Sequence, residues 1–168
     1  RPDDVCPRGQ DCEACQPPEG AYDVAIDAEI PARPRKDTGR FLEAGASHVA
    51  FVRALPERLP AALESAMTRL SGLSGVVIES TTAMPYVHGL RILVTREGRS
   101  EAKDSAHEAA ALADLFVVNQ DVGATRRVSA GDFPSGAKPL GKPIVPVCAT
   151  LGPEHPRNRE FITHCREF

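Results

Sequence analysis

The feature that most constrains the fold is a repeated alternation between short apolar segments and helix-like segments. The apolar segments are rich in Val, Ile and Leu, and two of them, GVVIES at 75–80 and LRILVTR at 90–96, are apolar on both faces. Strands of that kind are buried on both sides, as in parallel sheets covered by helices. The alternation therefore predicts an α/β domain with an open, mostly parallel sheet and helices on both faces.

The expected elements follow from periodicity and from helix-terminal residues. Strands are predicted at 21–30, 47–55, 75–80, 90–96, 114–120 and 142–150. Helices are predicted at 37–45, where Asp37 suits an N-cap and Gly45 a C-cap, at 59–70, at 105–113, and from Pro156 toward Cys165. Residues 1–20 have no periodicity and are predicted to form a Cys-rich loop segment. The single α/β domain is then expected to span 21–168.

Composition excludes several classes of protein. Hydrophobic residues make up 42% of the 168 residues and charged residues 26%, which is not the composition of a disordered chain. The net charge of −3 provides no electrostatic footprint for nucleic acid. No apolar run approaches the roughly 20 residues of a membrane span. The chain begins with Arg1 and no signal-peptide core follows, so we interpret it as processed or as a fragment, with a cytoplasmic location.

A cluster of cysteines near the start of the chain is a candidate metal site. Three of the five cysteines fall in CPRGQDCEAC with C-x5-C-x2-C spacing, and they are Cys6, Cys12 and Cys15. Two thiolates at C-x2-C spacing can reach one tetrahedral metal, which suggests Zn or an iron–sulfur cluster. The fourth ligand would be one of Cys148, Cys165, His164 or a residue upstream of Arg1. The alternatives are a reduced, partly exposed loop and a disulfide between Cys12 and Cys15.

Polar residues follow two of the predicted strands, where ligands bind in open α/β sheets. Glu79 comes directly after Val-Val-Ile, the place of a magnesium-binding or water-orienting acid in a nucleotide-binding sheet. The alternative is a strand-end carboxylate that meets solvent. Asn119 follows Leu-Phe-Val-Val, where an Asn contacts the base in a GTPase-like fold. The usual Lys is replaced by Gln120, and the expected Asp is out of register.

No true phosphate-binding loop occurs in these 168 residues. The one match to G-x4-G-K runs from Gly136 to Lys142 and is followed by Pro143 and a strand-like segment. A phosphate loop instead leads into a helix whose N-terminus receives the phosphate. We therefore interpret this segment as a basic turn.

The segment KDTGRFLEAGASHVAFV resembles the molybdopterin-guanine dinucleotide biosynthesis adaptor proteins, which belong to the P-loop NTPases. The residues that match the family's run are Lys36, Asp37, Thr38, Arg40, Ala44, Gly45 and Ala46, whereas Arg35 replaces a Gly. Glu79 matches the family's strand that ends in Glu-Gly, although Ser80 departs from it, and Arg96 matches a later strand that ends in Arg. Order and spacing agree over roughly residues 33–120.

The resemblance implies a P-loop NTPase-like domain that binds GTP or ATP with magnesium and acts in metal-cofactor assembly. Lys36, Thr38, Arg40 and Asn119 would bind the nucleotide, and Asp37 and Glu79 would be catalytic. The chain would be a homodimer or a subunit of a larger assembly. The family's opening strand, Walker A loop and first helix would lie before Arg1 if the chain is a fragment of an NTPase. Alternatively, the chain is a degenerate NTPase, a nucleotide-binding fold that has lost hydrolysis.

Purely structural roles would also account for the same residues. Asp37 serves equally well as a helix cap, and Lys36 and Arg40 as part of a solvated basic face. The alternative function is that of a non-catalytic Zn- or Fe–S-binding subunit of a larger complex, which rests on the cysteine run.

Overall fold

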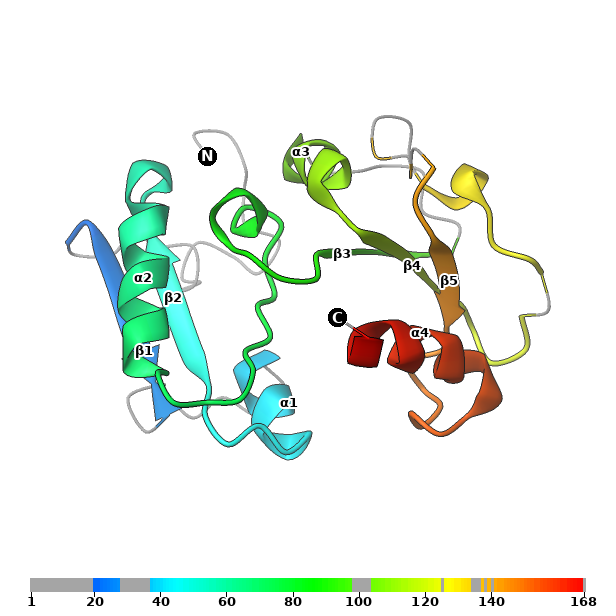
Figure 1. The fold of residues 1–168 in the computed structure, drawn as a ribbon, viewed down its shortest axis with the longest axis horizontal. Coiled ribbons are helices and arrows are strands. Elements are labelled where there is room, and N and C mark those ends of the chain that lie inside the picture. Colours follow the sequence, from blue (N-terminus) through cyan, green and yellow to red (C-terminus); the bar gives the residue numbers. More distant parts are fainter. Residues whose placement is uncertain are drawn as a thin grey trace, which may run out of the picture. The chain divides into compact units, whose positions relative to one another are not determined.

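The computed structural model of the chain describes residues 20–27, 37–97, 104–124, 126–133, 137, 139 and 141–167. Contacts divide the chain into two compact units, Arg1–Val77 and Ile78–Phe168. Figure 1 shows the elements of both. Each unit has its own arrangement of strands and helices and is considered by itself.

The first unit contains two strands, two α-helices and a short 3-10 turn. These elements are β1 (Tyr22–Ile26), α1 (Asp37–Glu43), β2 (Ala50–Ala54), η2 (Pro56–Arg58) and α2 (Leu59–Arg69). β1 and β2 pair in antiparallel fashion with Val24 opposite Val52, and α2 packs against both. The strands predicted at 21–30 and 47–55 thus form a two-stranded sheet of their own.

Pro60 and Gly45 lie at helix ends of the first unit as predicted, whereas Asp37, the predicted N-cap, is the first residue of α1. Pro60 lies in the first turn of α2, where a missing N–H leaves no hydrogen bond unmade. After α1, Gly45 adopts a φ of 96°, its N–H donates to Leu42, and the N–H of Ala46 donates to Phe41. This is the Schellman arrangement, and a left-handed φ is why Gly is favoured there. In α2 the buried face is Ala62, Leu63 and Ala66.

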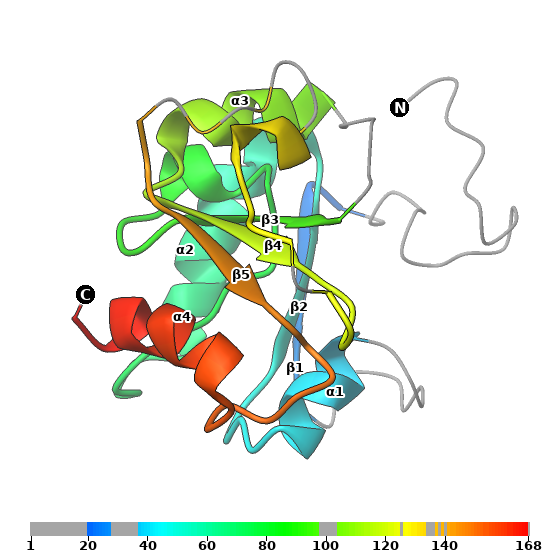
Figure 2. The same ribbon diagram turned by 90° about the vertical axis from the view of Figure 1, so that its right-hand side faces the viewer.

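The second unit is an α/β sandwich around a parallel sheet. Its elements are η3 (Met84–Tyr86), β3 (Ile92–Arg96), α3 (Asp104–Leu112), β4 (Leu115–Asn119), η4 (Ala130–Asp132), β5 (Ile144–Val147) and α4 (Pro156–Glu167). The strand order is β3-β4-β5, with both pairings parallel and β4 in the centre. The turned view in Figure 2 shows α3 and α4 on opposite sides of this sheet.

Alternating side chains of the central strand serve the two faces of the sheet. Phe116 and Val118 pack with Ala109 and Ala113 toward α3, and the ring of Phe116 meets that of Phe133 edge to face at 5.2 Å. Leu115 and Val117 pack on the other face, in a cluster that Phe161 of α4 completes. Because every side chain from 115 to 118 is buried, the strand reads as a continuous apolar run, as parallel strands do.

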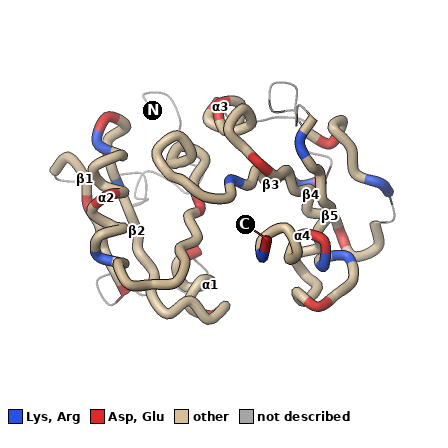
Figure 3. Tube along the Cα trace, in the orientation of Figure 1, with Lys and Arg blue, Asp and Glu red and all other residues tan. Residues whose placement is uncertain are grey.

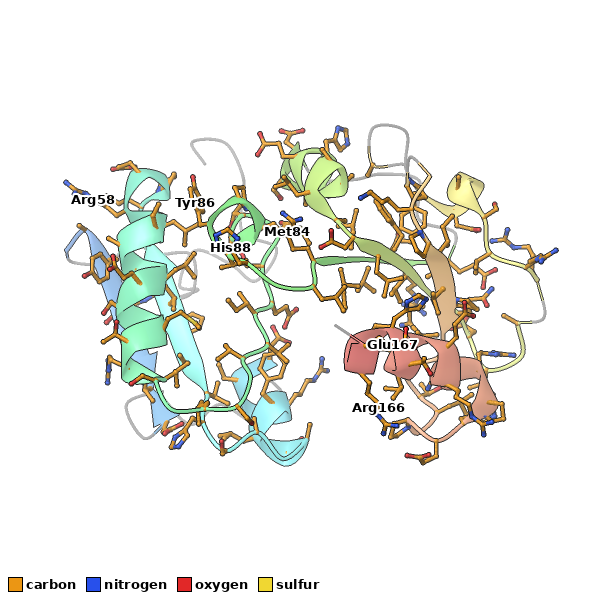
Figure 4. The ribbon with its side chains drawn as sticks, in the orientation of Figure 1. Arg58, Met84, Tyr86, His88, Arg166 and Glu167 are labelled. Atoms are coloured by element: carbon orange, nitrogen blue, oxygen red, sulfur yellow. The ribbon has the colours of Figure 1, made fainter. Side chains whose placement is uncertain are left out.

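The turn before β3 also contributes to this core. Met84 of η3 is buried against the cluster under α3, whereas Tyr86 in the same turn is half exposed (Figure 4). The side chain of Thr81 donates a hydrogen bond to Ser105 of α3 at 2.9 Å, which further ties this segment to the helix.

The predicted strand at 75–80 differs from the structure. No strand is formed there, and the side chain of Val77 is 83% exposed. A strand needs a neighbour to hydrogen-bond, and among the described residues none pairs with this segment. The apolar run therefore satisfies the pattern of a buried strand without the pairing that would make it one.

Candidate functional site

The three parallel strands of the second unit end at the same level. The register places Arg96, Asn119 and Val147 side by side at the ends of β3, β4 and β5. We call the segments that follow these strands the carboxyl edge: Glu97 after β3, the loop between β4 and η4, and the loop 148–152 after β5. In open α/β sheets, ligands bind beyond this edge, which makes it the candidate site.

Asn119 joins two of the loops at the carboxyl edge. It is the last residue of the central strand, and its Oδ1 accepts a hydrogen bond from the backbone N–H of Ala149 at 3.0 Å. Ala149 lies in the loop that follows β5. With Oδ1 used in this way, the Nδ2 of the side-chain amide is its hydrogen-bond donor group. The arrangement can donate to an acceptor atom of a bound ligand.

A hydrogen-bonded charge network lies beside Asn119. Oε1 of Glu97 accepts from Nε2 of Gln120 at 3.4 Å and from Nε of Arg126 at 3.1 Å. Arg126 also pairs with Asp132, which is buried and whose Oδ2 accepts from the backbone N–H of Ser129 at 2.7 Å. The network fixes the loop between β4 and η4 against the end of β3.

The balance of forces on Asp132 favours its charged form. Burial raises the pKa of this carboxyl, but the hydrogen bonds from Arg126 and from the backbone of Ser129 outweigh burial and hold the pKa below its ordinary value. Asp132 and Ser129 also form a capping box around η4. The carboxylate is thus the negatively charged partner of Arg126 in this network.

The loop after β5 contains a buried thiol. Cys148 is 1% exposed, and its Sγ lies 3.1 Å from the hydroxyl of Thr150. A hydrogen bond from Thr150 lowers the pKa of the thiol, with a smaller contribution from the charge of Arg157, against the opposing effect of burial. Burial of this kind keeps a thiol away from reagents, consistent with a structural cysteine.

The sequence-predicted residues fall in both units. Asp37, Thr38 and Arg40 lie on α1 of the first unit, where Arg40 and Asp37 form an exposed ion pair at 3.8 Å. Glu79 lies in the exposed, unpaired segment of the second unit, and Asn119 lies at the carboxyl edge. Lys36 and the three clustered cysteines, Cys6, Cys12 and Cys15, lie outside the described residues.

Sequence reasoning missed several residues of the carboxyl edge. Glu97, Arg126 and Asp132 belong to the charge network, and Glu97 lies 23 and 29 residues from its partners Gln120 and Arg126, so periodicity does not group them. One signal was available: Ser129 and Asp132 stand three apart, as in a capping box. Figure 3 shows Lys and Arg interspersed with Asp and Glu in both units, so charge alone does not mark this edge.

The described part of the chain contains neither a cluster of metal ligands nor a helix that could span a membrane. No group of three or more His, Cys, Asp or Glu side chains there is arranged to hold a metal ion. Within the same residues, no helix is both long enough and apolar enough to cross a bilayer.

The comparisons with known proteins were also negative. No family model matches the chain, and neither the curated proteins nor the solved structures give a significant match.

Proposed function

We propose that this chain is a nucleotide-binding domain for GTP or ATP, of the P-loop NTPase-like adaptor type that serves metal-cofactor assembly. The observation that carries the proposal is the placement of Asn119. It ends the central strand of a parallel sheet, at the edge where such sheets bind ligands, and its side chain is oriented by Ala149. An oriented amide at this point is suited to recognise the base of a nucleotide.

The resemblance of the segment at 36–46 to the adaptor family also supports the proposal. It supplies Lys36, Thr38 and Arg40 as candidates for nucleotide contact, and Asp37 as a candidate acid. In the structure, Arg40 and Asp37 point to each other in an exposed ion pair, which also accounts for them as a stabilised helix surface. The proposal therefore rests chiefly on the carboxyl edge.

Glu79 fits a role next to magnesium on chemical grounds. Its carboxylate and the hydroxyls of Ser80 and Thr82 are hard oxygen donors, the ligand type that Mg²⁺ prefers. Ser80 Oγ accepts from the backbone N–H of Ala83 at 3.2 Å and lies 3.0 Å from the Thr82 hydroxyl, which gives the turn a defined shape. Bound magnesium would neutralise phosphate charge during phosphoryl transfer to water. Glu79 itself would bind the magnesium ion or orient the attacking water.

The proposal is tested by calorimetric titration of the protein with magnesium-GTP and magnesium-ATP. We expect one of them to bind, and Asn119→Ala to weaken binding at least tenfold. Glu160→Ala, at an exposed position of α4, is the matched control and should leave affinity unchanged. If neither nucleotide binds the wild-type protein, the proposed function is wrong. If Asn119→Ala binds as tightly as wild type, Asn119 does not contact the ligand.

A second candidate function is metal binding by the cysteine run, which its C-x2-C spacing favours. Metal analysis of anaerobically purified protein would detect bound Zn or Fe. Replacing Cys12 and Cys15 together by Ser should release that metal. Protein without metal, or a double variant that retains all of it, would contradict this candidate.

A further inference from the structure

The first turn of α4 holds both loops of the carboxyl edge at once. Two adjacent residues do this, Arg157 and Asn158, and each is bonded to a different loop. Arg157 contacts the loop after β4, and Asn158 contacts the loop after β5. Asn119, the last residue of β4, is also bonded to the loop after β5, through Ala149.

The guanidinium of Arg157 gathers three backbone carbonyls. Its Nη1 donates to Asp121 and Val122, both at 3.1 Å, and its Nη2 donates to Ala124 at 2.6 Å. A planar guanidinium with several donors suits this task better than an ammonium group. These bonds set the path of the loop that directly follows Gln120.

Arg157 carries a positive charge in the first turn of α4, a position where a cation does not stabilise the helix. A cation in the first turn of a helix faces the positive end of the helix dipole, which is unfavourable for the helix itself. Three carbonyl dipoles offset that effect here. The residue is thus accounted for by the loop that it holds and not by the stability of α4.

Asn158 fixes the loop after β5 in a similar way. It is buried, its Oδ1 accepts from the N–H of Cys148 at 2.8 Å, and its Nδ2 donates to the carbonyls of Cys148, Leu151 and Gly152 at 3.0 to 3.1 Å. One amide side chain therefore connects the two ends of the loop 148–152. The N–H of Ala149 is held where Asn119 accepts from it.

We propose that Arg157 and Asn158 are positioning residues that couple the two loops of the carboxyl edge, so that both loops are pre-arranged around the base of a bound nucleotide. This inference rests on the proposed function for the identity of the ligand. The coupling itself rests on the contacts of α4. Loosening either contact should be felt in the loop that the other residue holds.

The test combines amide hydrogen exchange with nucleotide titration on the whole chain. In Arg157→Ala, we expect the amides of Cys148 and Ala149 to exchange at least tenfold faster, although Arg157 is bonded to the other loop. The same variant should bind magnesium-GTP or magnesium-ATP at least tenfold more weakly. Arg157→Lys should fall between wild type and Arg157→Ala. Arg159→Ala, an exposed arginine on the same helix, is the matched control and should change neither quantity.

The outcomes separate the inference from the proposed function. Failure of the wild-type protein to bind either nucleotide overturns the proposed function, and the exchange data then decide whether the loops are coupled. Unchanged exchange at Cys148 and Ala149 in Arg157→Ala overturns the coupling. Faster exchange with unchanged nucleotide affinity overturns the positioning role alone. Asn158→Ala is a second variant, but because Asn158 is buried, the half-buried Arg157 gives the cleaner result if that variant does not fold.

Discussion

The side chain of Asn119 accepts a hydrogen bond from the backbone N–H of Ala149 at 3.0 Å, joining the end of the central strand to the loop after its neighbour. The two residues are 30 positions apart in sequence. This bond, together with the contacts of Arg157 and Asn158, makes the carboxyl edge one connected structure. The proposed function and the inferred coupling both depend on it.

Loss of the Asn119 side chain should destabilise the second unit modestly. A single hydrogen bond of this type contributes about 1 kcal/mol to the free energy of unfolding, because water can replace it once the exposed Ala149 is released. We expect Asn119→Ala to lower stability by about that amount in urea unfolding. The exposed control Glu160→Ala should change it by less than about 0.5 kcal/mol. An effect of several kcal/mol would mean that Asn119 has a core role.

Stability should fall at acidic pH as Asp114 is protonated. Hydrogen bonding to the side chain of Arg91 lowers the pKa of Asp114, helped by the backbone N–H of Arg91 and by the charge of Lys142, against the effect of burial. Because the folded pKa lies below the unfolded value of about 3.9, the pair stabilises the fold fully above that value. The contribution is lost as pH falls through the folded pKa.

The measurement for Asp114 is urea unfolding between pH 2 and pH 7 for wild type and Asp114→Asn. Wild type should lose more stability on acidification than the variant, since the variant has no charge to lose at this position. Equal acid sensitivity of the two proteins would show that the Arg91–Asp114 pair does not contribute.

Substitutions of two valines test the structure against the prediction from the sequence pattern. Val77 is 83% exposed, so Val77→Lys should change the free energy of unfolding by less than about 0.5 kcal/mol. Val117 is 2% exposed in the central strand, so Val117→Ala should cost roughly 1 to 3 kcal/mol. Chemical denaturation of both variants tests this contrast. A large loss in Val77→Lys would place 75–80 in a buried strand after all, as the sequence pattern predicts.

Two described cysteines should differ in reactivity. Cys148 is buried and Cys165 is exposed. Alkylation requires access to the sulfur as well as the thiolate form, so the lowered pKa of Cys148 does not make it reactive in the folded protein. Peptide-mapped labelling with iodoacetamide should modify Cys165 first and Cys148 only after unfolding. Equal labelling rates in the native protein would contradict the buried position of Cys148.

Much of the secondary structure could be predicted because it depends on local patterns. The strands at 90–96 and 114–120 were identified from their continuous apolar runs, and the final helix from Pro156. The segment at 75–80 has the same pattern yet forms no strand, because pairing depends on a neighbour that local sequence does not reveal. Whether a strand joins a parallel or an antiparallel sheet is equally non-local, which explains the separate β1–β2 pair.

The candidate site was predictable only in part, for the same reason. Asn119 was found because it directly follows a recognisable buried strand. Arg157 and Asn158 bind loop residues that lie 6 to 36 positions away in the sequence. The local sequence around them does not predict those contacts. Their roles emerge only once α4 is placed on the sheet.

Thermal unfolding with and without nucleotide tests the central claim most directly. A ligand that binds only the folded state at 100 times its Kd adds about 2.7 kcal/mol of stability. For a unit of this size, that corresponds to a rise in Tm of roughly 10 °C or more. We predict such a rise with saturating magnesium-GTP or magnesium-ATP, and a clearly smaller rise at the same nucleotide concentration in Asn119→Ala. An unchanged Tm with millimolar concentrations of both nucleotides would contradict the account.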